Sequence, residues 1–166
     1  MDTFAHGLWG GVAFGRRGWR YFLFATLLGM APDLLTFGPR FFGWALAGFP
    51  DYPIEPGTTG APALASLSAH VFTAYNITHS LIVWTAAFIC LYLIAKKPPW
   101  LFCAWGLHIL CDIPTHTTRY FPTPFLWPFE TPYVDGIHWA QPWFLIPNYL
   151  FLVGMLAWIV WRAKKS

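Results

Sequence analysis

Apolar residues run in five long segments, which are separated by stretches rich in proline, glycine and charged residues. The segments cover residues 3–15, 19–35, 70–95, 99–113 and 142–161. Continuous apolar runs of this kind predict helices that lie in a membrane. At about 1.5 Å per residue, the first two are short for a bilayer core of about 30 Å. They are therefore predicted to be short spans or a partly re-entrant pair.

Two long stretches break this pattern and are predicted to be irregular loops. Residues 36–69 contain five prolines and one short piece, 40–49, that is predicted to lie at the membrane interface. Residues 114–140 begin with a proline, which disfavours helix in the residue before it, and are rich in aromatic side chains. Gly29 and Gly43 are expected to permit close contacts between helices.

Composition supports a membrane location. Of 166 residues, 57% are hydrophobic and only 10% are charged, and the mean hydropathy is +0.48; soluble domains carry about 25% charged residues. We therefore predict an all-α integral membrane protein with a single domain, residues 1–166. It would be a compact bundle of four to five transmembrane or re-entrant helices with two long outer loops, 36–69 and 114–140. The net charge of +3 is small, and the basic residues flank apolar runs. This pattern indicates membrane topology and not a nucleic-acid surface, so the predicted partners are membrane lipids and not nucleic acid.

The basic residues predict the orientation in the membrane. If all five segments cross, eight cations share one side, which the positive-inside rule makes cytoplasmic: Arg16, Arg17, Arg20, Lys96, Lys97, Arg162, Lys164 and Lys165. Only Arg40 and Arg119 fall on the other side, together with the acidic residues. The prediction is a multi-pass protein of the inner (plasma) membrane with a cytoplasmic C-terminus. If the first segment does not cross, only the N-terminus changes side.

Under this topology, five polar side chains on four apolar segments share one depth near the outer side: His6, Asp33, His79, His108 and Asp112. His108 and Asp112 are four residues apart, so a helix places them on one face. A charge at the centre of a membrane helix costs roughly 2.5–3.5 kcal/mol, and a shared metal ion would offset that cost. The five are therefore the candidate metal ligands.

Each of these groups also has an ordinary structural interpretation. An intramembrane histidine can be a hydrogen-bonded core residue, and Asp33 can be a loop carboxylate or a helix cap. Thr78 and Ser80 can cap a helix that begins near His79. His116, Arg119 and Ser80 lie near the predicted site and are candidate substrate contacts; an arginine could pair with an anionic substrate group.

Four motifs occur in a recognisable order: His6-Gly7, Pro32-Asp33, Thr78-His79-Ser80, and His108-x-x-x-Asp112 followed by Thr115 and Trp127-Pro128. Their order and spacing resemble those of the predicted membrane-bound metal-dependent hydrolases, the YdjM-like inner membrane proteins. More distantly, the ligand order is similar to that of zinc-dependent phospholipase C and related zinc nucleases. The chain departs from the family pattern at Leu35, Ala74 and Tyr75, where the family often has Asp, His and Arg.

The candidate ligands are three imidazoles and two carboxylates, a set that suits Zn²⁺ and also Mn²⁺ or Fe²⁺. Five ligands imply two ions, or one ion and a carboxylate outside its coordination shell. Asp33 and Asp112 are the candidate catalytic residues, and the one that does not bind the metal would act as general base. The resemblance then implies hydrolysis of a phosphoester or ester in an amphiphilic, lipid or lipid-linked substrate at the outer interface.

Two other functions remain open at this point. The cluster could be a structural or transport-related metal site in a membrane protein without enzymatic activity. Alternatively, the two aromatic loops could bind a partner protein while the histidines and aspartates satisfy one another. Polar groups on one side only argue against a transport path across the whole bilayer.

Overall fold

The computed structural model describes residues 1–48, 66–130 and 132–165, and this part of the chain is helical and contains no strand. Its helices are α1 (Thr3–Phe14), α2 (Trp19–Leu46), α3 (Ala69–Thr78), α4 (Leu81–Ala95), α5 (Cys103–Thr115) and α6 (Pro142–Ala163), with a short 3-10 turn η2 (Trp100–Phe102) before α5. The all-α class predicted from the hydropathy pattern is confirmed.

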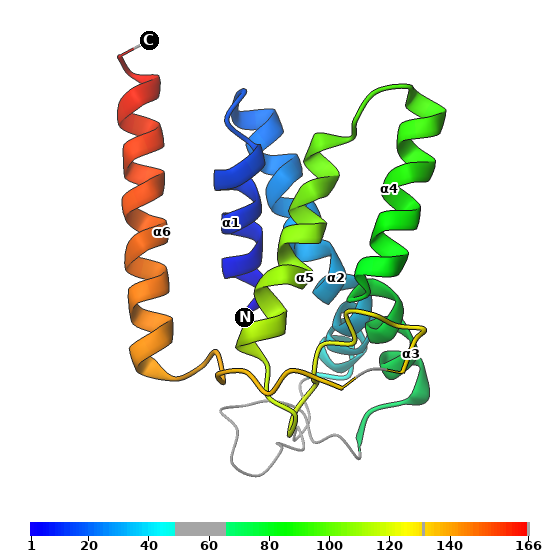
Figure 1. Cartoon of the computed structure of the whole chain (residues 1–166). Helices are drawn as coiled ribbons and strands as arrows, with labels where there is room; N and C mark the ends of the chain where they lie inside the picture. The colour runs from blue at the N-terminus through cyan, green and yellow to red at the C-terminus, as the bar shows by residue number, and fades with distance from the viewer. Residues whose placement is uncertain (49–65, 131, 166) are drawn as a thin grey trace.

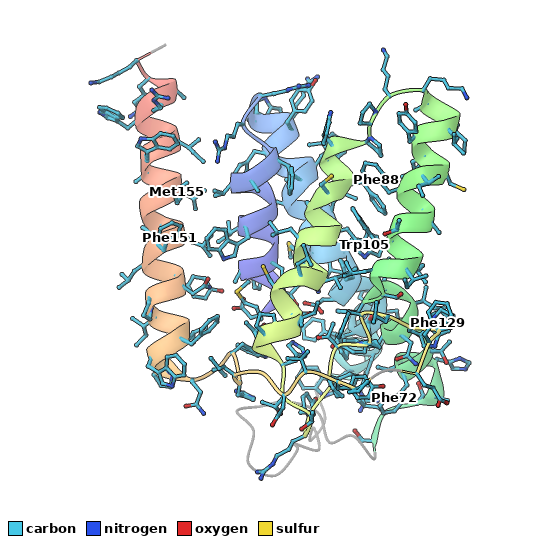
Figure 2. All side chains as sticks on the ribbon, viewed as in Figure 1. Phe72, Phe88, Trp105, Phe129, Phe151 and Met155 are labelled. Atoms are coloured by element: carbon cyan, nitrogen blue, oxygen red, sulfur yellow. The ribbon has the colours of Figure 1, made fainter. Side chains whose placement is uncertain are left out.

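Helix α1 lies at the centre of the bundle, with α2 and α5 packed against it and α6 on its outer side. Figure 1 shows the C-terminus and the turns α1–α2 and α4–α5 at one end. The N-terminus and the loop between α5 and α6 lie at the other end. Phe88 and Trp105 lie between α4 and α5, and Phe151 and Met155 lie on the side of α6 that faces α1 (Figure 2). The two ends of the bundle therefore differ: one is made of short basic turns and the other of longer loops.

Helix α2 is longer than predicted. The apolar pattern predicts that this helix ends at residue 35, but α2 runs through Pro32 and Pro39 to Leu46. Residues 40–46 are therefore part of α2 and not a separate interfacial piece. Thr36 Oγ donates a hydrogen bond of 2.8 Å to the Pro32 carbonyl inside the helix. Helices between apolar neighbours tolerate proline when side chains compensate for the lost backbone hydrogen bond. The predicted loop therefore begins after α2, and its residues 49–65 lie outside the described part of the chain.

The predicted single helix over 70–95 is wrong in one respect, because it is two helices that meet at an angle of 59°. The break falls at His79 and Ser80. Ser80 Oγ accepts hydrogen bonds from the backbone N–H groups of Ile82 and Val83 and so caps the start of α4. The corner lifts His79 out of a continuous helix and places it toward α2 and α5.

Two helices, α2 and α6, are long and apolar enough to cross a membrane, and the bent pair α3–α4 could count as a third. This is consistent with a membrane protein. Helices α1 and α5 have 12 and 13 residues, so each is only about 20 Å long or less. A bundle of four to five spans is therefore not confirmed.

Small residues bring α1 and α2 into close contact at the level of the polar cluster. A Cβ atom on Gly29 would lie 2.6 Å from the His6 carbonyl oxygen and 3.3 Å from the Gly7 Cα. The close approach predicted for Gly29 is thus present. Gly43 differs, because no described atom lies within 4 Å of the point where its Cβ would stand.

Candidate metal centre

Four polar side chains from three parts of the fold converge inside the bundle. Asp33 comes from α2, His79 from the corner between α3 and α4, and His108 and Asp112 from one face of α5. One ligand atom from each lies within 4.8 Å of the others. These four side chains form a group that could hold a metal ion.

The distances between the facing atoms are those of a coordination shell. His79 Nε2 and His108 Nε2 are 3.1 Å apart. Asp112 Oδ2 lies 3.2 Å from the His108 nitrogen and 3.5 Å from the His79 nitrogen. Asp33 Oδ1 lies 3.7 Å and 3.5 Å from the same two nitrogens. A tetrahedron with zinc–ligand bonds of 2.0–2.2 Å has edges of about 3.3–3.6 Å, so the donor atoms need little movement to surround one ion.

Hydrogen bonds outside the cluster hold both imidazoles in place, and one of them fixes the tautomer of His108. His108 Nδ1 lies 2.7 Å from the Gly29 carbonyl oxygen. His79 Nδ1 lies 3.2 Å from the Tyr75 carbonyl oxygen. Because a carbonyl can only accept, the Nδ1 of His108 carries the hydrogen, and its neutral ring presents a bare Nε2 to the cluster. His79 Nδ1 also lies 2.9 Å from the Thr78 hydroxyl, which can donate or accept, so the tautomer of His79 follows from the direction of that bond.

The interior of the cluster is therefore rich in acceptors. The His108 Nε2 and the facing carboxylate oxygens of Asp33 and Asp112 point lone pairs toward one another. Asp112 Oδ2 is buried and makes no hydrogen bond to the described residues. Such an arrangement is repulsive unless a cation lies between the atoms, either a metal ion or an added proton on a ring.

The fifth predicted ligand, His6, lies beside this group. Its ring stacks on His108 with centroids 3.7 Å apart, and its Nε2 lies 2.7 Å from Asp112 Oδ1. Its Nδ1 is buried and has no hydrogen-bond partner among the described residues. A donated Nε2–H would hold the Asp112 carboxylate so that its other oxygen faces the two histidines. The geometry supports a positioning role for His6 more directly than a place among the ligands.

Asp112 connects the cluster to a second set of nitrogens. Its Oδ1 lies 2.5 Å from the Met1 nitrogen and 3.3 Å from His116 Nε2, in addition to the contact with His6. The Met1 nitrogen also donates to Thr115 Oγ at 2.9 Å. Asp112 thus takes part in most of the ion pairs of the described residues.

The four candidate ligands differ in their access to the surface. The side chains of His79 and His108 are 0% exposed and that of Asp112 is 1% exposed, whereas the Asp33 side chain is 12% exposed. Asp33 Oδ2 accepts a hydrogen bond of 2.7 Å from Thr3 Oγ. Leu34 and Leu35, next to Asp33, are 45% and 56% exposed. Asp33 is therefore the most exposed of the four, and two exposed leucines follow it along α2.

The three predicted substrate contacts lie in different surroundings. His116 contacts Asp112, and its Nδ1 lies 2.7 Å from the Phe121 carbonyl oxygen. Ser80 is fully buried, caps α4 and donates to the Trp127 carbonyl at 2.6 Å. Arg119 is exposed in the loop, where its charge acts on Asp135. Of the three, only His116 touches the cluster.

Sequence reasoning missed Thr3 and the structural part played by Tyr75. Thr3 precedes His6 by three residues, so its place on the same face of α1 could have been found from helical spacing. Tyr75 stacks on His79 with centroids 4.0 Å apart, and its hydroxyl donates to the Phe121 carbonyl at 2.9 Å. Tyr75 is one of the positions at which the chain departs from the family pattern, and its ring packs against one side of the candidate centre.

The loop between α5 and α6 is tied to the end of α5 below the cluster. Its backbone N–H groups of Gly136 and Ile137 donate to the carbonyls of His116 and Pro114, each at 2.8 Å. Asp135 accepts hydrogen bonds from the backbone N–H and the hydroxyl of Thr118, and these bonds hold the pKa of its carboxyl below the usual value. The loop thereby covers the side of the centre where α5 ends.

Comparisons of the chain with protein-family models, with curated protein sequences and with solved structures found no match. The resemblance to membrane-bound metal-dependent hydrolases therefore stays a prediction from the four motifs, and arguments about function depend on the geometry of the centre.

Proposed function

We propose that the chain is a membrane-bound metal-dependent hydrolase that cleaves a phosphoester or ester bond in an amphiphilic substrate at the outer membrane interface. The observation that supports it is the convergence of two imidazoles and two carboxylates inside the bundle, with one ligand atom of each within 4.8 Å of the others. Asp33, His79, His108 and Asp112 would hold the ion. Zn²⁺ suits the nitrogen and oxygen donors and the distances between them, and Mn²⁺ or Fe²⁺ are the alternatives.

The burial of each residue suggests its role in the proposed hydrolysis. A divalent ion at this point would polarise a phosphoryl or carbonyl oxygen and favour deprotonation of a water. Asp33 is the most exposed of the four ligands, and its Oδ2 faces away from the two histidines, so that this second oxygen could take a proton from an entering water. His6 keeps Asp112 oriented toward the two histidines. The exposed Leu34 and Leu35 would lie against the apolar part of a substrate.

A structural metal site is the second candidate, and one observation favours it. The cluster offers four protein ligands, the number typical of a closed structural zinc site, and three of them are almost fully buried. A catalytic site keeps one position open. Both functions predict a bound metal ion, but only the hydrolase predicts turnover of a substrate.

The test is metal analysis together with hydrolysis assays on the protein purified in detergent. We expect one or more divalent ions per chain, and cleavage of phospholipid or of a chromogenic phosphoester or ester. Asp33→Asn and His79→Ala should each lower turnover at least about a hundredfold. His70→Ala is the matched control, since His70 is exposed on α3 outside the cluster, and it should retain activity.

Two outcomes would count against hydrolysis. Bound metal without turnover of any phosphoester or ester would favour the structural site. Absence of stoichiometric metal, with His108→Ala and Asp112→Ala both folded and functional in cells, would contradict the metal centre itself.

A further inference from the structure

The end of the bundle opposite the metal centre has a hollow lined by basic and aromatic side chains. It lies where the last turns of α6 approach the end of α1, at the end of the molecule that carries the C-terminus (Figure 1). Its volume is about 610 Å³, and it is lined chiefly by Arg16, Trp158, Trp161, Arg162 and Lys165. Three cations from two separate helix ends thus surround one space.

These cations have no anionic partner among the described residues. All ion pairs among the described residues involve Asp33 or Asp112, and these two lie at the other end of the bundle. Arg16 uses one of its five N–H groups on the Val12 carbonyl, at 3.1 Å. Arg162 and Lys165 lie over tryptophan rings at 5.2 Å and 4.1 Å, contacts that leave their charge in place. The hollow therefore has the charge and the free donors for an anion.

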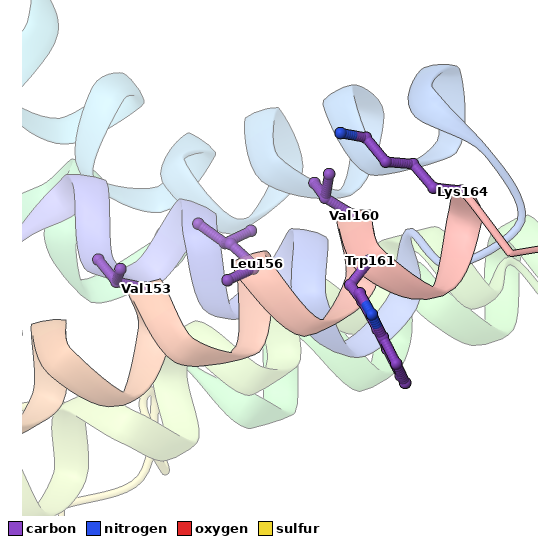
Figure 3. Close-up of a pocket in the computed structure, with 6 residues that line it drawn as sticks. Val153, Leu156, Val160, Trp161 and Lys164 are labelled. Atoms are coloured by element: carbon purple, nitrogen blue, oxygen red, sulfur yellow. The ribbon is translucent and has the colours of Figure 1, made fainter.

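A second, apolar hollow of about 520 Å³ adjoins the first along α6. Val153, Leu156, Val160 and Lys164 follow one another on one side of the helix (Figure 3), and the two hollows share Trp161. Val153 and Val160 are 62% and 54% exposed. The strip is apolar over about two turns and then ends in a lysine, so it changes from apolar to cationic along the helix axis.

We propose that these two hollows bind one anionic glycerophospholipid. Its phosphate would lie between Arg16 and Arg162, since guanidinium groups pair with phosphate through two parallel hydrogen bonds. One acyl chain would follow the apolar strip of α6. Tryptophan at the boundary and clustered cations are the usual features of a membrane interface that faces anionic lipid. This site is separate from the metal centre and does not depend on the proposed hydrolysis.

The test is native mass spectrometry of the delipidated protein in detergent, with phosphatidylglycerol or phosphatidylcholine added at equal concentrations. We expect one phosphatidylglycerol per chain to be retained, with at least about tenfold preference over phosphatidylcholine. Arg16→Gln combined with Arg162→Gln should remove that preference. Lys96→Gln combined with Lys97→Gln removes the same charge at the same end of the bundle, in the α4–α5 turn, and should leave it intact.

Three results would overturn the proposal. Equal retention of the two lipids would show that the charge does not select, and equal loss in both double variants would show diffuse attraction without a site. Displacement of the lipid by an equal concentration of glycerol 3-phosphate would show that the strip on α6 contributes nothing. Quenching of tryptophan fluorescence by brominated phosphatidylglycerol gives a measurement on the unaltered chain, and we expect it to exceed quenching by brominated phosphatidylcholine.

Discussion

Replacing Asp112 by alanine is expected to lower the free energy of unfolding by about 3–5 kcal/mol, the cost of removing one partner from a buried ion pair. Its Oδ1 lies within 3.3 Å of the Met1, His6 and His116 nitrogens, and its Oδ2 lies 3.2 Å from His108 Nε2. Alanine would remove this acceptor from the Met1, His6 and His116 nitrogens in a largely buried space. Thermal unfolding in detergent, followed by tryptophan fluorescence, should show a fall of the midpoint on the order of 10 °C.

Asp33→Ala is the matched control, since Asp33 belongs to the same cluster but reaches the surface. Its hydrogen-bond partner Thr3 could turn to water, so the loss should be only about 1–2 kcal/mol. Asp112→Asn retains an oxygen that can accept from His6 and loses the charge, and it should fall between the two. Equal midpoints for Asp112→Ala and Asp33→Ala would contradict the central place of Asp112 in the bundle.

The convergence of the cluster was predictable because it depends on two patterns that a sequence shows directly. The spacing of His108 and Asp112 places them on one face of a helix, and α5 carries them so. The distribution of basic residues predicted that Asp33 and His79 lie at the same depth. Four of the five expected side chains bring a ligand atom within 4.8 Å of one another, and the fifth, His6, packs beside them, although their expected roles as ligands stay predictions.

Local details of the fold were harder to predict because they depend on compensating contacts between distant residues. Proline normally ends a helix, but α2 continues through Pro32 and Pro39 with Thr36 bonded to a carbonyl inside it. The bend at His79 required a choice between a continuous helix and a capped restart at Ser80, and both agree with the hydropathy. The contact of His6 with Asp112 joins residues 106 positions apart, which no local pattern encodes.

A second large effect is expected at the contact between α1 and α2, where Gly29→Ala should weaken both the fold and metal binding. The added Cβ would lie 2.6 Å from the His6 carbonyl oxygen, so backbone and not a flexible side chain must move. Gly29 also supplies the carbonyl that fixes the His108 ring, at 2.7 Å from its Nδ1. We expect unfolding to become easier by about 1–3 kcal/mol. Metal affinity, measured by competition with a chelating dye, should fall about 10–100-fold.

Gly43→Ala makes the same change about four turns further along the same helix, where no described atom lies within 4 Å of the new Cβ. Because alanine favours helix over glycine by up to about 1 kcal/mol, this variant should be as stable as the parent or slightly more stable, with unchanged metal affinity. A Gly29→Ala protein that binds metal as tightly as Gly43→Ala would mean that the close contact of α1 with α2 does not set the geometry of the centre. If instead affinity falls while the unfolding midpoint stays near that of the parent, the displacement is local to His6 and His108, and the carbonyl of Gly29 is the feature that holds the histidine in place.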